Sequence, residues 1–186
     1  MRRPTIFESI ANQPTLTGGK VRLRPRRVED ASDYYRWRTD AKLCQLDATT
    51  PIEYSFSEFL ERYSTEIEYP GMSYNYAIET LDGRHIGECG LFHIDLLSSN
   101  AEIGILIGER EYWDRGYGYD CMQTFLHHIF QSYDLNMIIL RTLDWNIRAQ
   151  SCFKKCGFEI CGELLKGDYT FIIMRITRER FLHSHQ

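Results

Sequence analysis

The sequence predicts a single α/β (α+β) domain with a mixed, mostly antiparallel central sheet of about six to seven strands, flanked by helices. Strand-like segments come in pairs joined by short turns, which is typical of antiparallel hairpins. A helical pattern then follows one strand and leads into a continuous apolar run, which indicates a parallel strand–helix–strand unit. The 186 residues, 43% of them apolar, are enough for one hydrophobic core, so a second domain is not expected.

The chain starts with a segment of little pattern. Residues 1–19 end in two glycines, and we expect them to form a leader before a single domain of residues 20–186. Residues 21–25 alternate apolar side chains with arginines, and one of the apolar positions is a proline. This pattern predicts an edge strand whose arginines face solvent.

Two helices are expected next. Acidic Glu29 and Asp30 open an aromatic-rich helical segment, and residues 57–67 form a second helix that ends before Pro70-Gly71. Together these helices could form the wall of a substrate pocket.

Strands dominate from residue 74 onward. Residues 74–81 and 84–94 flank Asp82-Gly83, a strong hairpin signal, and residues 101–108 return in a second hairpin. A helix then runs to about residue 133. The apolar run 137–143 that follows is typical of a buried central strand.

The last third of the domain begins with a short helix. Ala149, Cys152, Phe153 and Cys156 fall on one helical face, and Gly157 stands where a left-handed C-terminal cap belongs. Strands at 158–165 and 169–176 complete the sheet.

The turn before the long helix has two glycines, Gly116 and Gly118. The first backbone N–H groups of a helix have no intrahelical partner and can bind a phosphate, which glycine allows to come close. A Walker A loop would need Lys and Ser or Thr where Tyr119-Asp120 stands, and a dinucleotide fold would need a glycine or alanine where Cys121 stands. A pyrophosphate that carries a long acyl arm is the simplest remaining ligand.

Composition excludes several classes of function. The net charge is −4 with mixed signs throughout, so a nucleic-acid partner is not expected, and a cationic small substrate is easier to accommodate. The six cysteines form no CxxC pair, which favours a cytoplasmic protein with reduced thiols. No apolar run approaches the length of a membrane span, and the adjacent His127 and His128 cannot face one metal ion, so we expect neither membrane nor metal binding.

Three linked motifs resemble one family, the GNAT N-acetyltransferases, and in particular the branch of ribosomal-protein N-terminal acetyltransferases and spermidine acetyltransferases. The motifs are Ala101 to Gly108 followed by Tyr112 to Gly118, then Asp144 to Ala149, and finally Lys155 to Phe158. The resemblance covers residues 20–181 and implies a sheet splayed at an acyl-CoA site. The family often has Gln or Arg three residues before the first glycine, whereas this chain has Trp113.

The resemblance implies a set of acetyl-CoA contacts. Backbone amides would cradle the pyrophosphate at Arg115, Gly116, Tyr117, Gly118, Tyr119 and Asp120, and the pantetheine arm would pair with Ile105, Leu106 and Ile107 as an added strand. Asn146 resembles the asparagine that binds the coenzyme near its pantetheine, although it can equally cap the helix after it. Ser151 and Phe153 lie on that helix beside the expected coenzyme.

Amine acetylation needs a neutral amine, because an alkylammonium has no lone pair with which to attack. Glu102 resembles the strand glutamate that acts as the base in several relatives, and Glu88 on the neighbouring strand is the second candidate, acting directly or through a water. Phe153 stands where the family usually has a tyrosine acid. Ser151, Tyr169 or a water could protonate the thiolate instead, or the thiolate could leave unprotonated.

The sequence thus predicts an acetyl-CoA-dependent N-acetyltransferase that works by direct attack of a primary amine in a ternary complex. The acceptor can be a protein N-terminus, a polyamine or another small amine, and the protein a monomer or a homodimer. The alternative is a non-catalytic acyl-CoA-binding or sensory module.

Overall fold

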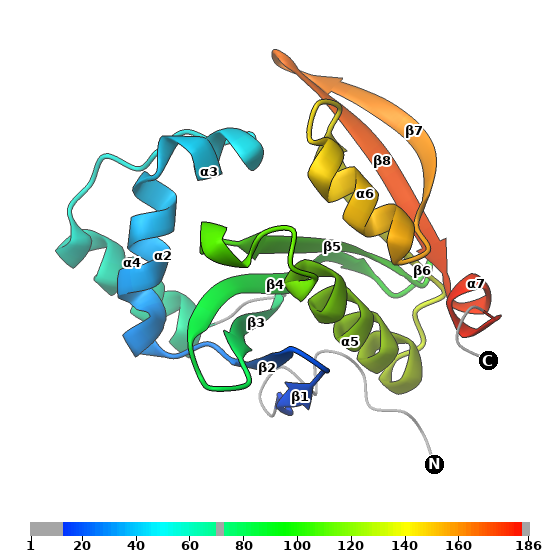
Figure 1. The fold of residues 1–186 in the computed structure, drawn as a ribbon, viewed down its shortest axis with the longest axis horizontal. Helices are drawn as coiled ribbons and strands as arrows, with labels where there is room; N and C mark the ends of the chain where they lie inside the picture. The colour runs from blue at the N-terminus through cyan, green and yellow to red at the C-terminus, as the bar shows by residue number, and fades with distance from the viewer. Residues whose placement is uncertain (1–12, 70–72, 184–186) are drawn as a thin grey trace.

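An eight-stranded sheet in the order β1-β2-β3-β4-β5-β6-β8-β7 runs through the protein (Figure 1). The computed structural model describes residues 13–69 and 73–183. The strands are β1 (Leu16–Thr17), β2 (Val21–Pro25), β3 (Tyr74–Thr80), β4 (His85–Asp95), β5 (Asn100–Ile107), β6 (Met137–Leu143), β7 (Glu159–Lys166) and β8 (Tyr169–Thr177). Among the described strands, only the β5–β6 pair is parallel, which confirms the mixed, mostly antiparallel sheet, with slightly more strands than the sequence predicted.

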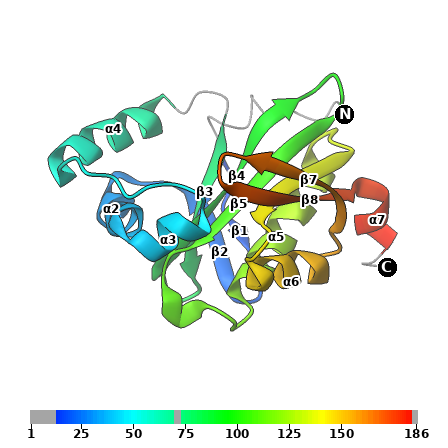
Figure 2. The same ribbon diagram turned by 90° about the horizontal axis from the view of Figure 1, so that it is seen from above.

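Helices cover both faces of the sheet (Figures 1 and 2). They are α2 (Ala31–Thr39), α3 (Ala41–Leu46), α4 (Phe56–Glu68), α5 (Tyr117–Ser132), α6 (Ile147–Lys155) and α7 (Arg178–His183), with short 3-10 turns η1 (Val28–Asp30) and η2 (Arg110–Tyr112). The apolar face of α5 packs into the main core with the side chains of β2, β3 and β4. Helices α2, α3 and α4 form a second, aromatic cluster with Leu106 of β5.

Helix α3 was not predicted from the sequence. Asp40 has an extended backbone and ends α2, and its side chain accepts hydrogen bonds from the N–H groups of Lys42 and Leu43 to start α3. A helix of only six residues is too short to show a period of 3.6, so its sole sequence signal was the acidic cap.

The N-terminal predictions need two corrections. Leu16 and Thr17, which we assigned to the leader, pair with β2 as the short strand β1, so β2 is not the edge strand. Residues 1–12 lie outside the described residues. Nor does Arg24 face solvent, because its side chain is only 6% exposed.

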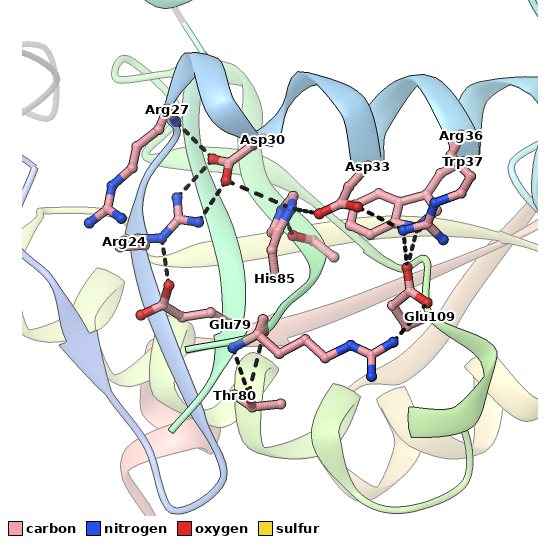
Figure 3. Close-up of polar contacts among 12 residues, drawn as sticks. Arg24, Arg27, Asp30, Asp33, Arg36, Trp37, Glu79, Thr80, His85 and Glu109 are labelled. Carbon is pink, nitrogen blue, oxygen red and sulfur yellow. Dashed lines mark hydrogen bonds and ion pairs between the residues drawn. The ribbon is translucent and has the colours of Figure 1, made fainter. Parts of the chain in front are cut away.

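Arg24 belongs to a buried ionic network between β2, β3 and α2 (Figure 3). Its guanidinium donates two hydrogen bonds to the carboxylate of Asp30, at 2.8 and 2.7 Å, and one to Glu79, at 2.6 Å. His85 extends the network to Asp33, at 3.0 Å. The alternating pattern correctly predicts a strand, but Glu79, which covers Arg24 together with the nearby Asp30, lies 55 positions away.

The sheet splits between β5 and β6. The two strands are paired only at Asn100–Met137, Ala101–Ile138 and Glu102–Ile139, the first three positions of β5. Beyond Glu102, β5 stays paired with β4 as far as Ile107, while β6 stays paired with β8 as far as Leu143. The facing edges therefore diverge, and in Figure 1 the β7–β8 hairpin rises away from β5.

Gly157 ends α6 with φ of +96°, as expected for a left-handed cap. None of the helices in the described parts of the chain combines the length and apolar character needed to cross a bilayer.

Candidate functional site

Two cavities open beside the split in the sheet. The first, of about 470 Å³, lies between the end of β5, the glycine turn and α6, and we call it the donor cavity. The second, of about 450 Å³, lies between β5, β6 and β8, and we call it the acceptor cavity. Both are lined by Leu46, Asp47, Ile105, Asn146, Ala149 and Phe153, so the two cavities meet at these residues.

The glycine turn presents backbone donors to the donor cavity. Gly116 has φ of +83° and serves as the N-cap of α5, and no side chain caps this helix end. The first helical N–H to find a partner in the helix is that of Asp120, which donates to the carbonyl of Gly116 at 3.0 Å. The amides at residues 117–119 precede it and have no intrahelical acceptor. Gly116, Gly118 and Tyr119 line the cavity, so the helix end suits an anion.

Asp120 differs from the other residues assigned to the phosphate cradle. Its amide bonds within the helix, and its carboxylate accepts three hydrogen bonds from the amides of Gly19, Lys20 and Val21, at 3.0, 2.7 and 3.0 Å. Both groups are therefore committed to the fold. Asp120 ties the start of β2 to α5, and its predicted contact with the coenzyme stays a prediction.

The side chains of Arg115 and Tyr117 do not line either cavity. Arg115 donates to the carbonyl of Glu111 at 3.1 Å, and the ring of Tyr117 packs edge-on against Tyr112. The contact that the sequence predicted for these two residues is through their backbone amides, and it stays a prediction.

The strand edge at Ile105, Leu106 and Ile107 lines the donor cavity, as the resemblance implied. Its other edge pairs with β4, and beyond Glu102 no described strand pairs with the edge that faces the cavity. The indole Nε1 of Trp113 donates to the carbonyl of Ile107 at 2.7 Å and closes the far end of this edge. Backbone groups of the strand are thus available to an amide-bearing arm such as pantetheine.

Arg148 and Trp113 form a pair that the sequence did not predict. The guanidinium carbon of Arg148 lies 3.4 Å from the centroid of the Trp113 ring, and both side chains line the donor cavity, as does Lys155. Burial lowers the pKa of Arg148, and Asp114 only partly opposes this effect. Within the described residues no carboxylate forms an ion pair with Arg148, so its charge is available to an anionic ligand.

Asn146 caps the start of α6, which is one of the two roles that the sequence allowed for it. Its side chain accepts a hydrogen bond from the amide of Ala149 at 3.3 Å, and Asn146 also lines both cavities. Ser151 is exposed and lines the donor cavity, whereas Phe153 is 7% exposed and lines both cavities. Because Phe153 has no hydroxyl, the candidate side-chain acids near the cavities are Ser151 and Tyr169, and Tyr169 lines the acceptor cavity.

Glu102 lines the acceptor cavity but is already paired. Its carboxylate accepts two hydrogen bonds from Arg141 on β6, at 2.8 and 2.5 Å, and lies 3.0 Å from the Nδ1 atom of His93. Burial alone would raise the pKa of Glu102, but these hydrogen bonds outweigh it and hold the pKa below its usual range. A paired carboxylate of low pKa is a weak proton acceptor.

Glu88 has the opposite electrostatics. It lies on β4 opposite Leu106, whose side chain packs against the aromatic cluster of α2 and α4, and it lines neither cavity. Burial raises the pKa of Glu88, with further raising by Asp47 and Glu66, while Tyr34 and Arg26 oppose the rise.

Two buried hydroxyls lie in the aromatic cluster next to Glu88. Tyr34 and Tyr63 are each 4% exposed, and neither hydroxyl forms a hydrogen bond of ordinary geometry among the described residues, although the Tyr34 hydroxyl lies close enough to Glu88 to lower the pKa of that carboxyl. Buried hydroxyls are normally satisfied, often by an ordered water. Tyr34 and Tyr63, like Glu88, line neither cavity.

The described residues contain no group of three His, Cys, Asp or Glu side chains that could hold a metal ion.

Comparisons with known proteins agree with this geometry. The family model described as the acetyltransferase (GNAT) domain matches residues 20–159. A protein of Bacillus licheniformis, described as the uncharacterized N-acetyltransferase p20, is 26% identical over 152 residues, which are 81% of this chain and 85% of that protein.

Solved structures share the fold. The spermidine N-acetyltransferase from Vibrio cholerae, in complex with CoA and spermine, matches with a TM-score of 0.78 at 22% identity over 87% of this chain and 98% of that chain. The aminoglycoside acetyltransferase AAC(6')-Ib in complex with coenzyme A matches with a TM-score of 0.74 at 19% identity, over 89% and 99% of the two chains.

Proposed function

Because the chain belongs to the GNAT acetyltransferase family and uses acetyl-CoA as its acyl donor, we propose that it N-acetylates a primary amine by direct attack in a ternary complex. The observation that carries this proposal is the meeting of the two cavities at the split between β5 and β6. A donor in one cavity and an amine in the other would place their reacting atoms near Ile105, Asn146 and Phe153. Such positioning is a major part of catalysis in acyl transfer.

The chain supplies the binding groups of the donor half. When bound, acetyl-CoA supplies an acetyl group as a thioester. The free amides at the start of α5 and the guanidinium of Arg148 face the anionic part, while the open edge of β5 is available to the amide-bearing arm.

In the transfer, the amine nitrogen forms a bond to the acetyl carbon, the C–S bond breaks, and the sulfur leaves as a thiolate. A substrate ammonium loses one proton before the attack, and we assign this proton to Glu88, directly or through a water, because the pKa of Glu88 is raised. The amine loses a second proton as the amide forms, and this proton goes to the thiolate or to solvent. Glu102, the first candidate from the sequence, has its charge compensated by Arg141 and holds the wall of the acceptor cavity.

Among the residues that line the two cavities, Ser151 and Tyr169 are our candidates for protonating the thiolate. A thiolate of ordinary pKa, roughly 8.5, can also leave without a proton, so Phe153 does not prevent turnover. The cytoplasmic location and the monomeric or dimeric state stay predictions.

Amine-dependent release of free thiol from acetyl-CoA tests the proposed function. A panel of primary amines is offered at saturating donor, with a tertiary amine of similar size as the control. We expect release with at least one primary amine and none with the tertiary amine. Tight binding of acetyl-CoA with no release across a broad panel would instead favour the acyl-CoA-binding module.

A further inference from the structure

The acceptor cavity is balanced in charge. Its lining includes four charged side chains, of which Asp47 and Glu102 are acidic and Arg141 and Lys166 are basic. A cavity built for a molecule with several ammonium groups needs several unpaired carboxylates, because each ammonium removed from water must be compensated. The formal charges of these four residues cancel.

Of the two carboxylates, that of Glu102 is already paired with an arginine. The carboxylate of Glu102 accepts hydrogen bonds from two guanidinium nitrogens of Arg141, which lies on β6 across the split from β5. Its third contact is with His93. Such a bidentate pair is among the stronger interactions between side chains. Asp47 has one longer contact, at 3.4 Å, from Arg38, and it lines both cavities where they meet. It is therefore the carboxylate best placed for a substrate ammonium.

Most of the other residues in the lining are apolar, although polar and apolar atoms contribute about equally to the surface of the whole cavity. The lining includes four aromatic rings from three elements, Phe92 of β4, Phe153 of α6, and Tyr169 and Phe171 of β8, together with aliphatic side chains of β5 and β6. Rings of this kind bind apolar or aromatic groups and contribute substantially to small-molecule affinity.

We propose that the preferred acceptor carries a single ammonium group on an apolar or aromatic body, with the ammonium at Asp47 and the body against Phe92, Tyr169 and Phe171. This inference rests on the proposed function and names the acceptor class of the same site. It separates this protein from the two structural neighbours above, which were solved with or act on spermine or aminoglycosides. An arylalkylamine and a peptide N-terminus with an apolar first side chain share the required chemistry.

The test compares kcat/KM for four acceptors: phenethylamine, a dipeptide amide with N-terminal leucine, spermine and kanamycin. We expect the better of the first two to exceed both polycations by about tenfold or more. The comparison of phenethylamine with the dipeptide amide shows whether the preferred acceptor is an arylalkylamine or a peptide N-terminus. Equal or better turnover of spermine or kanamycin overturns the inference but leaves the proposed function intact, whereas no turnover of any amine contradicts the proposed function.

A variant tests the charge argument independently. Arg141→Gln releases the Glu102 carboxylate into the cavity, so the ratio of spermine to phenethylamine turnover should rise severalfold, with unchanged binding of acetyl-CoA. Arg175→Gln is the matched control, because Arg175 pairs with Glu159 and does not line the cavity. An unchanged ratio in folded Arg141→Gln would overturn the role assigned to the Glu102–Arg141 pair.

Asp47→Asn tests the ammonium site. We expect a higher KM for phenethylamine with little change in acetyl-CoA affinity measured by calorimetry. An unchanged KM would remove Asp47 from the site.

Discussion

Glu88 and Glu102 are both strand glutamates near the split, and their surroundings make them different acids. If Glu88 accepts the amine proton, its raised pKa places the acidic limb of the kcat/KM profile above the ordinary range of a glutamate. Glu88→Gln should lower kcat by about 10²-fold and remove that limb. Glu102→Gln should leave the limb in place. A limb that survives in Glu88→Gln would show that another group is the base.

The same residue has a measurable effect on stability. The pKa of Glu88 is raised on folding, so folding favours its protonated form, and the ionised form costs stability once the pH exceeds the folded-state pKa. Glu88→Gln should therefore melt higher than the wild type at neutral pH. The difference should vanish below roughly pH 4, where the glutamate is protonated in both states. A difference that is constant with pH would contradict the electrostatic explanation.

Arg148 should contribute to coenzyme affinity through the phosphate groups. Arg148→Gln should weaken binding of CoA by about tenfold in calorimetry, since it removes a charge-assisted contact of roughly 1.5 kcal/mol, and it should leave binding of pantetheine, which has no phosphate, unchanged. Lys154→Gln is the control, because Lys154 is exposed on the same helix outside the donor cavity. Equal losses for CoA and pantetheine would indicate a packing role on Trp113 instead.

At the scale of elements, the buried network around Arg24 joins β2, β3 and the start of α2. Removing the guanidinium in Arg24→Met leaves Asp30 and Glu79 as buried carboxylates with fewer partners, which should lower the free energy of unfolding by about 3 kcal/mol in urea denaturation. Arg22→Met is the comparison, because Arg22 also pairs with Glu79 but is 37% exposed, and we expect about 1 kcal/mol or less.

The stability that Arg24→Met loses should depend on pH, and the direction of this dependence can be predicted. Burial raises the pKa values of Asp30 and Glu79, but hydrogen bonds from Arg24 outweigh it and hold both pKa values below their usual range. Their contribution is present above the unfolded-state values, near pH 4, and is lost as the pH falls through the folded-state pKa values. The gap between wild type and Arg24→Met should therefore narrow in acid, and a gap that widens there would contradict the assignment.

At the scale of the whole molecule, local patterns predicted most elements but not the contacts between them. The hairpin at Asp82-Gly83, the buried strand 137–143 and the cap at Gly157 each carry a local signal, and the structure has all three. The pairing of Glu102 with Arg141 and the stack of Arg148 on Trp113 join residues that are remote in sequence. No spacing rule predicts such contacts, and the first of them bears on Glu102, for which the sequence suggested the role of base.

The glycine turn before α5 also shows that a local pattern does not predict contacts with distant segments. Local sequence correctly placed the helix start at the glycines, but Asp120 has its carboxylate bound to the amides of residues 19–21, about one hundred positions away. Its role follows from the packing of β2 against α5, which the pattern of either segment does not contain.

The central claim is direct transfer between a donor and an acceptor held at the same time in two cavities that meet. Initial-rate kinetics with both substrates varied tests it most directly. A ternary complex predicts lines that intersect in double-reciprocal plots, and no acetylated protein after incubation with acetyl-CoA alone. Parallel lines, together with an acetyl group on a residue of the donor cavity such as Cys152, would contradict the account.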